Sequence, residues 1–158
     1  MIADVIQTKL MSIEEKVLKR PDYAQWMRTK HPESPAGTRI NCLIVLFDLK
    51  PYQVLCRGCS RLARKAVVER GLASHLSFLC DDNCQNDYGI RNGTLCVLPN
   101  YIHALCYVEF ECDGSKVAQR SIIREMAEAK GLPKQTGKAG AAKFFAPGMP
   151  TRPLDWWG

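Results

Sequence analysis

The sequence has 158 residues, of which 46% are hydrophobic and 24% are charged, as is ordinary for a soluble globular protein. This length allows one domain with extensions or two very small units, and no apolar run approaches the ~20 residues that cross a bilayer. The net charge of +6 is concentrated in residues 113–158, where eight Lys and Arg accompany four Asp and Glu. This basic balance favours nucleic-acid phosphates or acidic protein surfaces as partners.

The N-terminus has no signal-peptide pattern, because Met1–Val5 contains neither a basic stretch nor the start of an apolar one. We therefore expect a cytoplasmic protein. Thiols stay reduced in that compartment, which makes the eight cysteines candidates for metal ligation rather than for disulfides.

Residues 1–31 form the predicted N-terminal helical segment, because apolar side chains recur there every three or four positions. Ser12 and Glu15 have the spacing of a capping box, which predicts that a helix begins inside this segment. Pro21 interrupts the pattern and opens a further helical turn. Residues 31–37 have the composition of a linker. We expect the helices of this segment to pack together or to dimerise.

A second unit is predicted over residues 40–131. The apolar run of residues 41–49 predicts a buried strand, and residues 94–98 predict another. Apolar and polar side chains alternate along residues 101–112, which is typical of a half-buried strand. Together these segments predict a short antiparallel sheet.

One helix completes this unit, and a tail follows it. The helix is predicted over residues 116–130, with Ser115 as its N-cap and Gly131 just past its end. Residues 132–158 are rich in Gly, Ala, Lys and Pro, which predicts a basic, flexible tail that contains aromatic residues. The predicted fold class is α+β, with N-terminal helices, a short antiparallel sheet and a C-terminal helix.

Four cysteines form the strongest motif of the sequence. Cys56 and Cys59 make a C-x2-C pair, and Cys80 and Cys84 make a C-x3-C pair further along. One Zn²⁺ ion binds four thiolates tetrahedrally at about 2.3 Å. Gly58 permits a tight turn in the first pair, and the second spacing suits one face of a helix. The sequence therefore predicts one closed, structural zinc site.

The segment from residue 53 to residue 90 resembles treble-clef zinc fingers of the FCS, TRASH and MYM kind. Those fingers have a C-x2-C knuckle, then C-x3-C on a short helix, then an aromatic residue one turn later, which Tyr88 matches here. The resemblance implies a four-cysteine zinc site and a β-hairpin between the cysteine pairs. Residues 61–70 are locally typical of a helix instead, so both interpretations stay open. Such fingers bind DNA, RNA or protein, so the resemblance does not select among these partners.

The other four cysteines are Cys42, Cys96, Cys106 and Cys112, which lie in apolar segments with irregular spacing. Free cysteine is commonly a small buried hydrophobic residue, and this is the interpretation that we favour. The alternative is a second metal site that includes His103.

Two groups of cations are predicted to contact nucleic acid. One group lies at and after the first cysteine pair, and the other repeats every four residues along the predicted C-terminal helix. They are Arg57, Arg61, Arg64 and Lys65 in the first group, and Lys116, Arg120 and Arg124 in the second. A repeat of four projects from one helical face, where it can follow a phosphate backbone. The alternative is an ordinary solvated helix face, which the nearby Glu125 and Glu128 support.

These features predict a zinc-binding protein that binds DNA or RNA or acts as a transcription-associated regulator, and its compact size suits a bacterial or phage protein. The alternative is an adaptor or inhibitor whose tail binds an acidic partner, such as a polymerase or nuclease complex. The tail aromatics suit either role, because they can stack on bases or dock on a protein. They are Phe144, Phe145, Trp156 and Trp157.

Catalysis is the least supported function. The sequence contains no Ser-His-Asp, P-loop or dinucleotide-binding signature, and a four-cysteine site has no open position for a reactive water. The remaining enzymatic hypothesis is a metal-dependent nuclease that uses Glu109, Glu111 and Lys116 near a strand end. We assign no catalytic residue.

Overall fold

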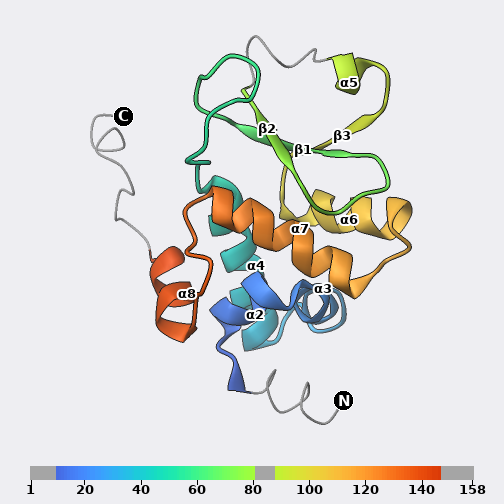
Figure 1. Cartoon of the computed structure of the whole chain (residues 1–158). Helices are drawn as coiled ribbons and strands as arrows, with labels where there is room; N and C mark the ends of the chain where they lie inside the picture. Colours follow the sequence, from blue (N-terminus) through green and yellow to red (C-terminus); the bar gives the residue numbers. More distant parts are fainter. Residues whose placement is uncertain (1–9, 81–87, 147–158) are drawn as a thin grey trace.

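The computed structural model describes residues 10–80 and 88–146, which form a helical layer and a small sheet (Figure 1). The elements in chain order are α2 (Ile13–Lys19), α3 (Pro21–Lys30), α4 (Pro35–Leu49), β1 (Lys65–Glu69), β2 (Ser77–Leu79), α5 (Tyr88–Arg91), β3 (Leu95–Leu98), α6 (Tyr101–Glu111), α7 (Lys116–Ala129) and α8 (Lys138–Phe144). These helices and the separate antiparallel sheet confirm the predicted α+β class. Within these two ranges, no helix is both long enough and apolar enough to cross a membrane.

The sheet has the strand order β2-β1-β3, and both neighbours of β1 run antiparallel to it. In its middle, Val67 lies opposite Ser77 of β2 and Val97 of β3. Side chains alternate between the two faces of a strand. Ala66 and Val68 belong to the large core of the helical layer, whereas Val67 belongs to a second, small cluster that contains cysteines. The sheet therefore separates the helical core from Cys56, Cys59 and Cys80.

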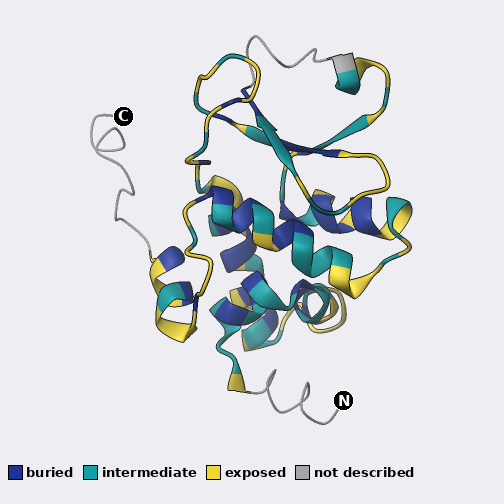
Figure 2. Cartoon of the chain, viewed as in Figure 1, coloured by how far each residue is buried: buried dark blue, intermediate teal, exposed yellow. Residues whose placement is uncertain are grey.

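Within the helical layer, α7 contacts α2, α3 and α6, and Figure 1 shows it between the sheet and the N-terminal helices. Figure 2 shows that α4, α6 and α7 each have a buried side. The rings of Phe47 and Tyr101 meet edge to face with their centroids 5.2 Å apart. The Tyr101 hydroxyl donates a hydrogen bond to the Val17 carbonyl oxygen at 2.7 Å. The described parts of all three predicted units share this one core.

Four helix boundaries follow signals that are visible in the sequence. Ser12 and Glu15 form the predicted capping box at the start of α2, and Pro21 is the first residue of α3. At the start of α7, the Ser115 side chain accepts a backbone hydrogen bond. Gly131 follows the end of α7 with a φ of +106°, in the left-handed region that favours glycine.

The strand predicted over residues 41–49 is wrong, because these residues belong to α4. The Ser34 side chain caps this helix, and Pro35 is its first residue, so the predicted linker is shorter than residues 31–37. Burial follows the helical period: Ile40, Leu43, Ile44 and Phe47 are buried, whereas Cys42, Val45 and Leu49 are exposed. A short apolar run fits a buried strand and a buried helix equally well, and the helix start lies outside the run.

The strand predicted over residues 101–112 is also wrong, because residues 101–111 form α6. The Asn100 side chain caps this helix by accepting a hydrogen bond from the His103 N–H at 2.8 Å. Cys106 and Phe110 are exposed, although a period of two would place both on the buried face. Its buried residues Tyr101, Ala104, Leu105 and Val108 recur at helical spacing, so the segment fits a second period as well, and the cap favours the helix.

The two interpretations of residues 61–70 are resolved by β1, which pairs with β2 as an antiparallel hairpin. A helix over these residues is therefore excluded. The hairpin is the local structure that the resemblance to zinc fingers implies.

The predicted flexible tail is wrong over residues 138–144, which form α8. Phe144 and Phe145 are only 6% and 4% exposed, and the Phe144 ring centroid lies 6.2 Å from that of Phe47. Their burial removes both rings from base stacking. Trp156 and Trp157 lie outside the described residues.

Candidate metal centre

The first cysteine pair lies on a tight turn that precedes β1. Leu55 and Leu62 pair as an isolated antiparallel bridge, which closes the turn around Cys56 and Cys59. The Gly58 N–H donates a hydrogen bond to Cys56 Sγ at 3.3 Å. A backbone N–H directed at a sulfur stabilises its thiolate form. The turn thus prepares Cys56 for metal ligation.

The strand β2 brings the second cysteine motif to this turn, because Cys80 directly follows its last residue. The Arg57 N–H donates to the Phe78 carbonyl oxygen at 3.0 Å, and the Arg64 N–H donates to the Leu79 carbonyl oxygen at 2.8 Å. The donor Arg57 precedes Cys59 in the chain, and the donor Arg64 follows it. They hold the cysteine turn against β2.

The sulfur atoms of Cys56, Cys59 and Cys80 all lie within 4.8 Å of one another. The Sγ atoms of Cys59 and Cys80 are 3.5 Å apart, close to the separation of about 3.8 Å for thiolates around one tetrahedral zinc ion. Cys56 and Cys80 are 3% and 2% exposed, and Cys59 is half-buried. The structure therefore brings three of the predicted ligands together in a geometry that fits one metal ion.

Apolar side chains surround this cysteine group. Val67 and Leu79 are completely buried against it, and Leu95, Val97 and the α5 residue Ile90 pack around it. Such surroundings exclude water. Buried thiolates without a compensating cation are unfavourable, so a metal ion would remove a large electrostatic cost. A donor set made only of sulfur suits zinc or another thiophilic metal.

The fourth predicted ligand, Cys84, lies outside the described residues, as does the side chain of Tyr88. Within residues 10–80 and 88–146, no further His, Cys, Asp or Glu joins the group of three. The structure thus supports a metal site of at least three cysteines.

The remaining cysteines form no second metal-binding group in the described part of the chain. Cys42 and Cys106 are exposed, so the prediction that they are buried is wrong, whereas Cys96 and Cys112 are half-buried. Burial raises the pKa of the Cys96 and Cys112 thiols, which favours their neutral form. His103 is exposed on α6.

The first predicted group of cations lies beside the cysteine group. Arg57, Arg61 and Arg64 are exposed, and Lys65 is half-buried at the start of β1. The Arg57 guanidinium donates a hydrogen bond to Ser77 Oγ at 3.0 Å, which ties it to β2. These residues therefore belong to the sheet side of the molecule.

The second predicted group lies on α7, on the helical side. Lys116 and Arg124 are exposed, whereas Arg120 is half-buried and its Nε atom is buried without a hydrogen-bond partner among the described residues. Burial opposes the ionisation of Asp22 at the start of α3. The hydrogen bonds and charge of Arg20, together with the charge of Arg120, outweigh this effect and hold the pKa of Asp22 below its ordinary value. Arg120 of α7 is thus close enough to α3 to affect Asp22, so the cations of α7 adjoin those of the N-terminal helices.

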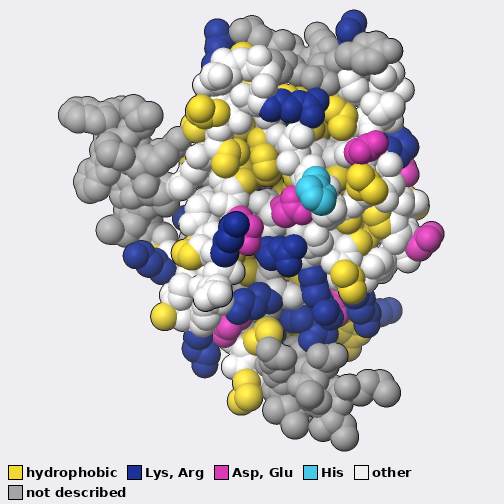
Figure 3. Space-filling view, in the orientation of Figure 1, with side chains coloured by type: hydrophobic (Ala, Val, Ile, Leu, Met, Phe, Trp, Pro, Cys, Tyr) yellow, Lys and Arg dark blue, Asp and Glu magenta, His cyan; other side chains and the backbone are white. Residues whose placement is uncertain are grey.

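We call the surface of α2, α3 and α7 the basic face. With Arg20, these helices carry eight Lys and Arg against five Asp and Glu, and Figure 3 shows Lys and Arg gathered over them in the lower half of the view. The cations are Lys16, Lys19, Arg20, Arg28, Lys30, Lys116, Arg120 and Arg124. Those of α2 and α3 were not predicted as binding residues. They lie far from α7 in the sequence, and only helix packing joins them.

The acidic residues of the nuclease hypothesis do not meet at a strand end. Glu109 and Glu111 are on α6, where a separation of two residues turns their side chains about 200° apart. The Glu111 carboxylate pairs with the Arg70 guanidinium at 2.6 Å. Asp48, at the end of α4, accepts a hydrogen bond from the Tyr101 N–H at 2.9 Å. The described acids therefore form no shared metal site.

Comparisons with models of protein families, with curated proteins and with solved structures find no match to this chain. Its function is therefore inferred from the cysteine group and the basic face.

Proposed function

We propose that this chain is a zinc-stabilised nucleic-acid-binding protein. One zinc ion orders the outer side of the sheet, and the basic face of α2, α3 and α7 contacts phosphates. A regulatory role in transcription is compatible with this function, because binding alone, without catalysis, is sufficient for it.

Zinc suits the cysteine group because three clustered sulfurs are available and thiolates are its preferred ligands in structural sites. We propose Cys84 as the fourth ligand, since it follows Cys80 by four residues and precedes Ile90 by six. The Ile90 side chain packs against the cluster. A bound ion would supply positive charge to the thiolates and cross-link the turn to β2.

The basic face is the observation that carries the nucleic-acid part of the proposal. Three packed helices place cations from distant parts of the sequence on one surface (Figure 3). Cations gathered on one surface can bind several phosphates of a nucleic acid and release its condensed counterions. The Glu125 carboxylate on α7 accepts hydrogen bonds from the His75 and Leu76 N–H groups, so it is directed at the loop between β1 and β2.

The metal is tested by native mass spectrometry of the full chain, purified without added metal and measured before and after treatment with a strong chelator. One zinc per chain is the expected result. A cysteine group that carries no metal, in a protein with an intact fold, would contradict the zinc part of the proposal.

Nucleic-acid binding is tested by fluorescence anisotropy with labelled oligonucleotides over a range of salt concentrations. The variant Lys116→Glu/Arg124→Glu reverses two exposed charges of the basic face, and we expect it to weaken binding by at least about tenfold and to flatten the salt dependence. Lys138→Glu is the control, because Lys138 is an exposed cation on α8. Binding that is insensitive to salt, or equally weakened by both variants, would count against the basic face. We avoid Arg120 because it is half-buried.

A protein-interaction adaptor is the second candidate, and exposed apolar side chains favour it. Val45 and Leu49 on α4 are 56% and 74% exposed, and Phe110 on α6 is 83% exposed. Under this hypothesis, replacing them with polar residues abolishes capture of a protein partner while nucleic-acid binding remains unmeasurable.

A further inference from the structure

The helix α3 carries a cluster of aromatic rings at the edge of the basic face, and we propose that Trp26 in this cluster stacks on an unpaired base. The ligand is then single-stranded nucleic acid rather than a duplex. This inference rests on the proposed function and specifies its substrate class.

The geometry of the rings supports a stacking surface. Trp26 is 49% exposed, a large fraction for an indole on a folded helix. Its ring centroid lies 4.9 Å from that of His31, edge to face, and 6.2 Å from that of Tyr23. The two neighbouring rings restrict the indole, so little side-chain entropy is lost when a base stacks on it.

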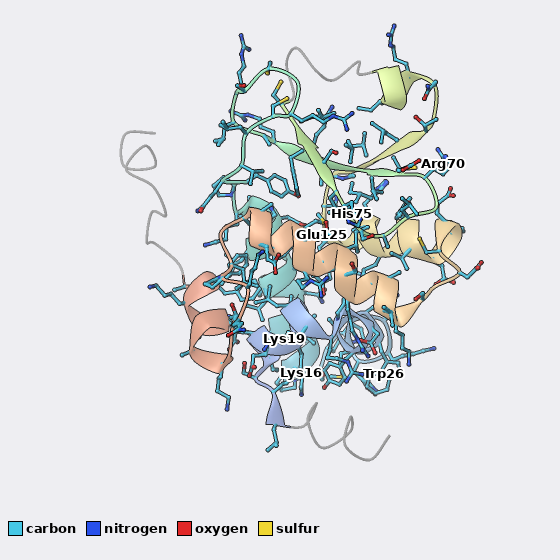
Figure 4. All side chains as sticks on the ribbon, in the orientation of Figure 1. Lys16, Lys19, Trp26, Arg70, His75 and Glu125 are labelled. Atoms are coloured by element: carbon cyan, nitrogen blue, oxygen red, sulfur yellow. The ribbon has the colours of Figure 1, made fainter. Side chains whose placement is uncertain are left out.

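Cations surround this aromatic cluster. The Lys16 Nζ atom lies 4.6 Å from the centroid of the Tyr23 ring, and α3 itself contributes Arg28 and Lys30. Figure 4 shows Lys16, Lys19 and Trp26 at the same end of the molecule, away from the sheet. The acidic residue of α3, Asp22, is paired with Arg20 at 3.1 Å. Charge complementarity therefore favours a polyanion as the occupant.

A single strand fits this arrangement better than a duplex does. An exposed ring stacks on any base whose face is accessible, whereas the bases of a duplex are already stacked. Phe144 and Phe145 are buried, whereas the α3 cluster places the exposed Trp26 beside Tyr23, whose ring contacts the Lys16 cation. Base stacking contributes about 1–3 kcal/mol per base, which corresponds to an affinity change of about 5- to 150-fold.

The test uses the intrinsic fluorescence of Trp26. The sequence has three tryptophans, so replacing Trp156 and Trp157 by Phe in the full chain leaves Trp26 as the sole reporter. We titrate this protein with oligo(dT), with oligo(rU) and with a DNA duplex of the same length. We expect the single strands to quench the fluorescence of Trp26 strongly and the duplex to leave it nearly unchanged.

A second measurement uses substitutions of Trp26. Trp26→Ala is expected to lower the affinity for single strands by about 5- to 150-fold, with the salt slope and the duplex affinity unchanged, and Trp26→Phe is expected to restore most of the loss. Salt-dependent binding without quenching, and with equal affinities for Trp26→Ala and the parent, would overturn the stacking inference but leave the basic face intact. Absence of binding to every oligonucleotide would overturn both.

Discussion

The two faces of the sheet are covered by clusters of very different size. The face of Ala66 and Val68 joins a core of 26 buried residues in the described part of the chain. The opposite face, with Val67, joins four buried residues, two of which are Cys56 and Cys80. Adjacent residues of one strand thus contribute to a large apolar core on one side and to a candidate metal site on the other.

This difference in burial indicates that a metal ion can replace apolar packing on the outer side of the sheet. The helical side contains most of the buried apolar side chains, so apolar packing contributes most to its stability. The outer side consists of a turn, the short strand β2 and few apolar side chains, so it lacks the burial that would offset its loss of conformational entropy. A metal ion bound by the cysteines would fill this deficit, because its binding free energy would contribute directly to folding. The two sides should therefore respond differently to metal removal.

The largest expected effect is the loss of the outer side when the metal is removed. Structural zinc contributes about 10–16 kcal/mol of apparent binding free energy in zinc-finger peptides. After chelation, or in Cys80→Ser, we expect the amides of Arg57 and Arg64 to lose protection from hydrogen exchange, while the amides of α7 keep it. Mass spectrometry of exchanged peptides measures both. Equal loss of amide protection on the two sides would show that they fold as one unit.

A matched pair of substitutions sharpens this comparison. Val67 and Val68 are 0% and 1% exposed and point to opposite faces of β1. With metal bound, we expect Val67→Ala and Val68→Ala each to lower the free energy of unfolding by about 2 kcal/mol. Without metal, only Val68→Ala should retain that effect. Denaturant unfolding with and without chelator measures the four values, and a persistent effect of Val67→Ala would contradict the assignment of the faces.

A buried lysine tests the helical side alone. Lys130 is 4% exposed, and its Nζ donates hydrogen bonds to the carbonyl oxygens of Phe47 at 2.9 Å and of Lys50 at 2.7 Å. It thus satisfies carbonyl groups at the end of α4. Burial lowers the pKa of Lys130 from its ordinary 10.5 to about 8, although the nearby Asp48 charge opposes this change.

This lowered pKa predicts how stability depends on pH. Between pH 8 and 10.5 the unfolded chain binds more protons at Lys130 than the folded chain does, so the free energy of unfolding rises with pH. We expect the wild type to gain about 2 kcal/mol relative to Lys130→Met between pH 8 and pH 10. Urea unfolding at several pH values measures this difference. It should persist after chelation, and a difference that disappears with the metal would place Lys130 in the outer unit.

The sequence predicts helices correctly where a cap precedes an amphipathic repeat, and it fails at α4 and α6, whose caps Ser34 and Asn100 precede largely apolar segments. Ser12 and Ser115 mark the starts of α2 and α7 through side-chain hydrogen bonds that depend on local spacing. Residues 41–49 are a nearly continuous apolar run, and residues 101–112 place apolar side chains at both strand and helical spacings, so each segment fits a strand and a helix alike. The helix α4 packs on α2 and α3, and α6 packs on α7 and β3, and this tertiary information is not local.

The candidate site shows the same division between local and non-local information. The spacing of Cys56, Cys59 and Cys80 predicts their clustering, because a knuckle and a hairpin are short-range structures. The basic face was predicted only for its α7 residues. The cations and Trp26 of the N-terminal helices join it through tertiary packing. The spacing of Tyr23 and Trp26, three residues apart, is equally typical of a buried helix face, so it did not indicate an exposed ring.

The smallest expected effect concerns the link between the two sides. The Glu125 carboxylate on α7 accepts hydrogen bonds from the His75 N–H at 3.1 Å and from the Leu76 N–H at 2.9 Å, in the loop between β1 and β2. Figure 4 shows Glu125 and His75 next to each other above α7. His75 has a φ of +58°, and successive N–H groups in such a conformation form a concave site for an anion.

Glu125→Gln replaces the carboxylate by an amide with a single acceptor oxygen, so the loop keeps at most a weaker pair of hydrogen bonds. We expect the free energy of unfolding to fall by about 1 kcal/mol, with faster hydrogen exchange at the amides of His75 and Leu76. Glu128→Gln is the matched control, because it removes the same charge from the same helix, whereas among the described residues it is Glu125 that accepts the hydrogen bonds of this loop. If both variants exchange alike, Glu125 does not join the two sides, and the outer unit is held to the helical layer by the sheet and by contacts with α6 such as the Arg70–Glu111 ion pair.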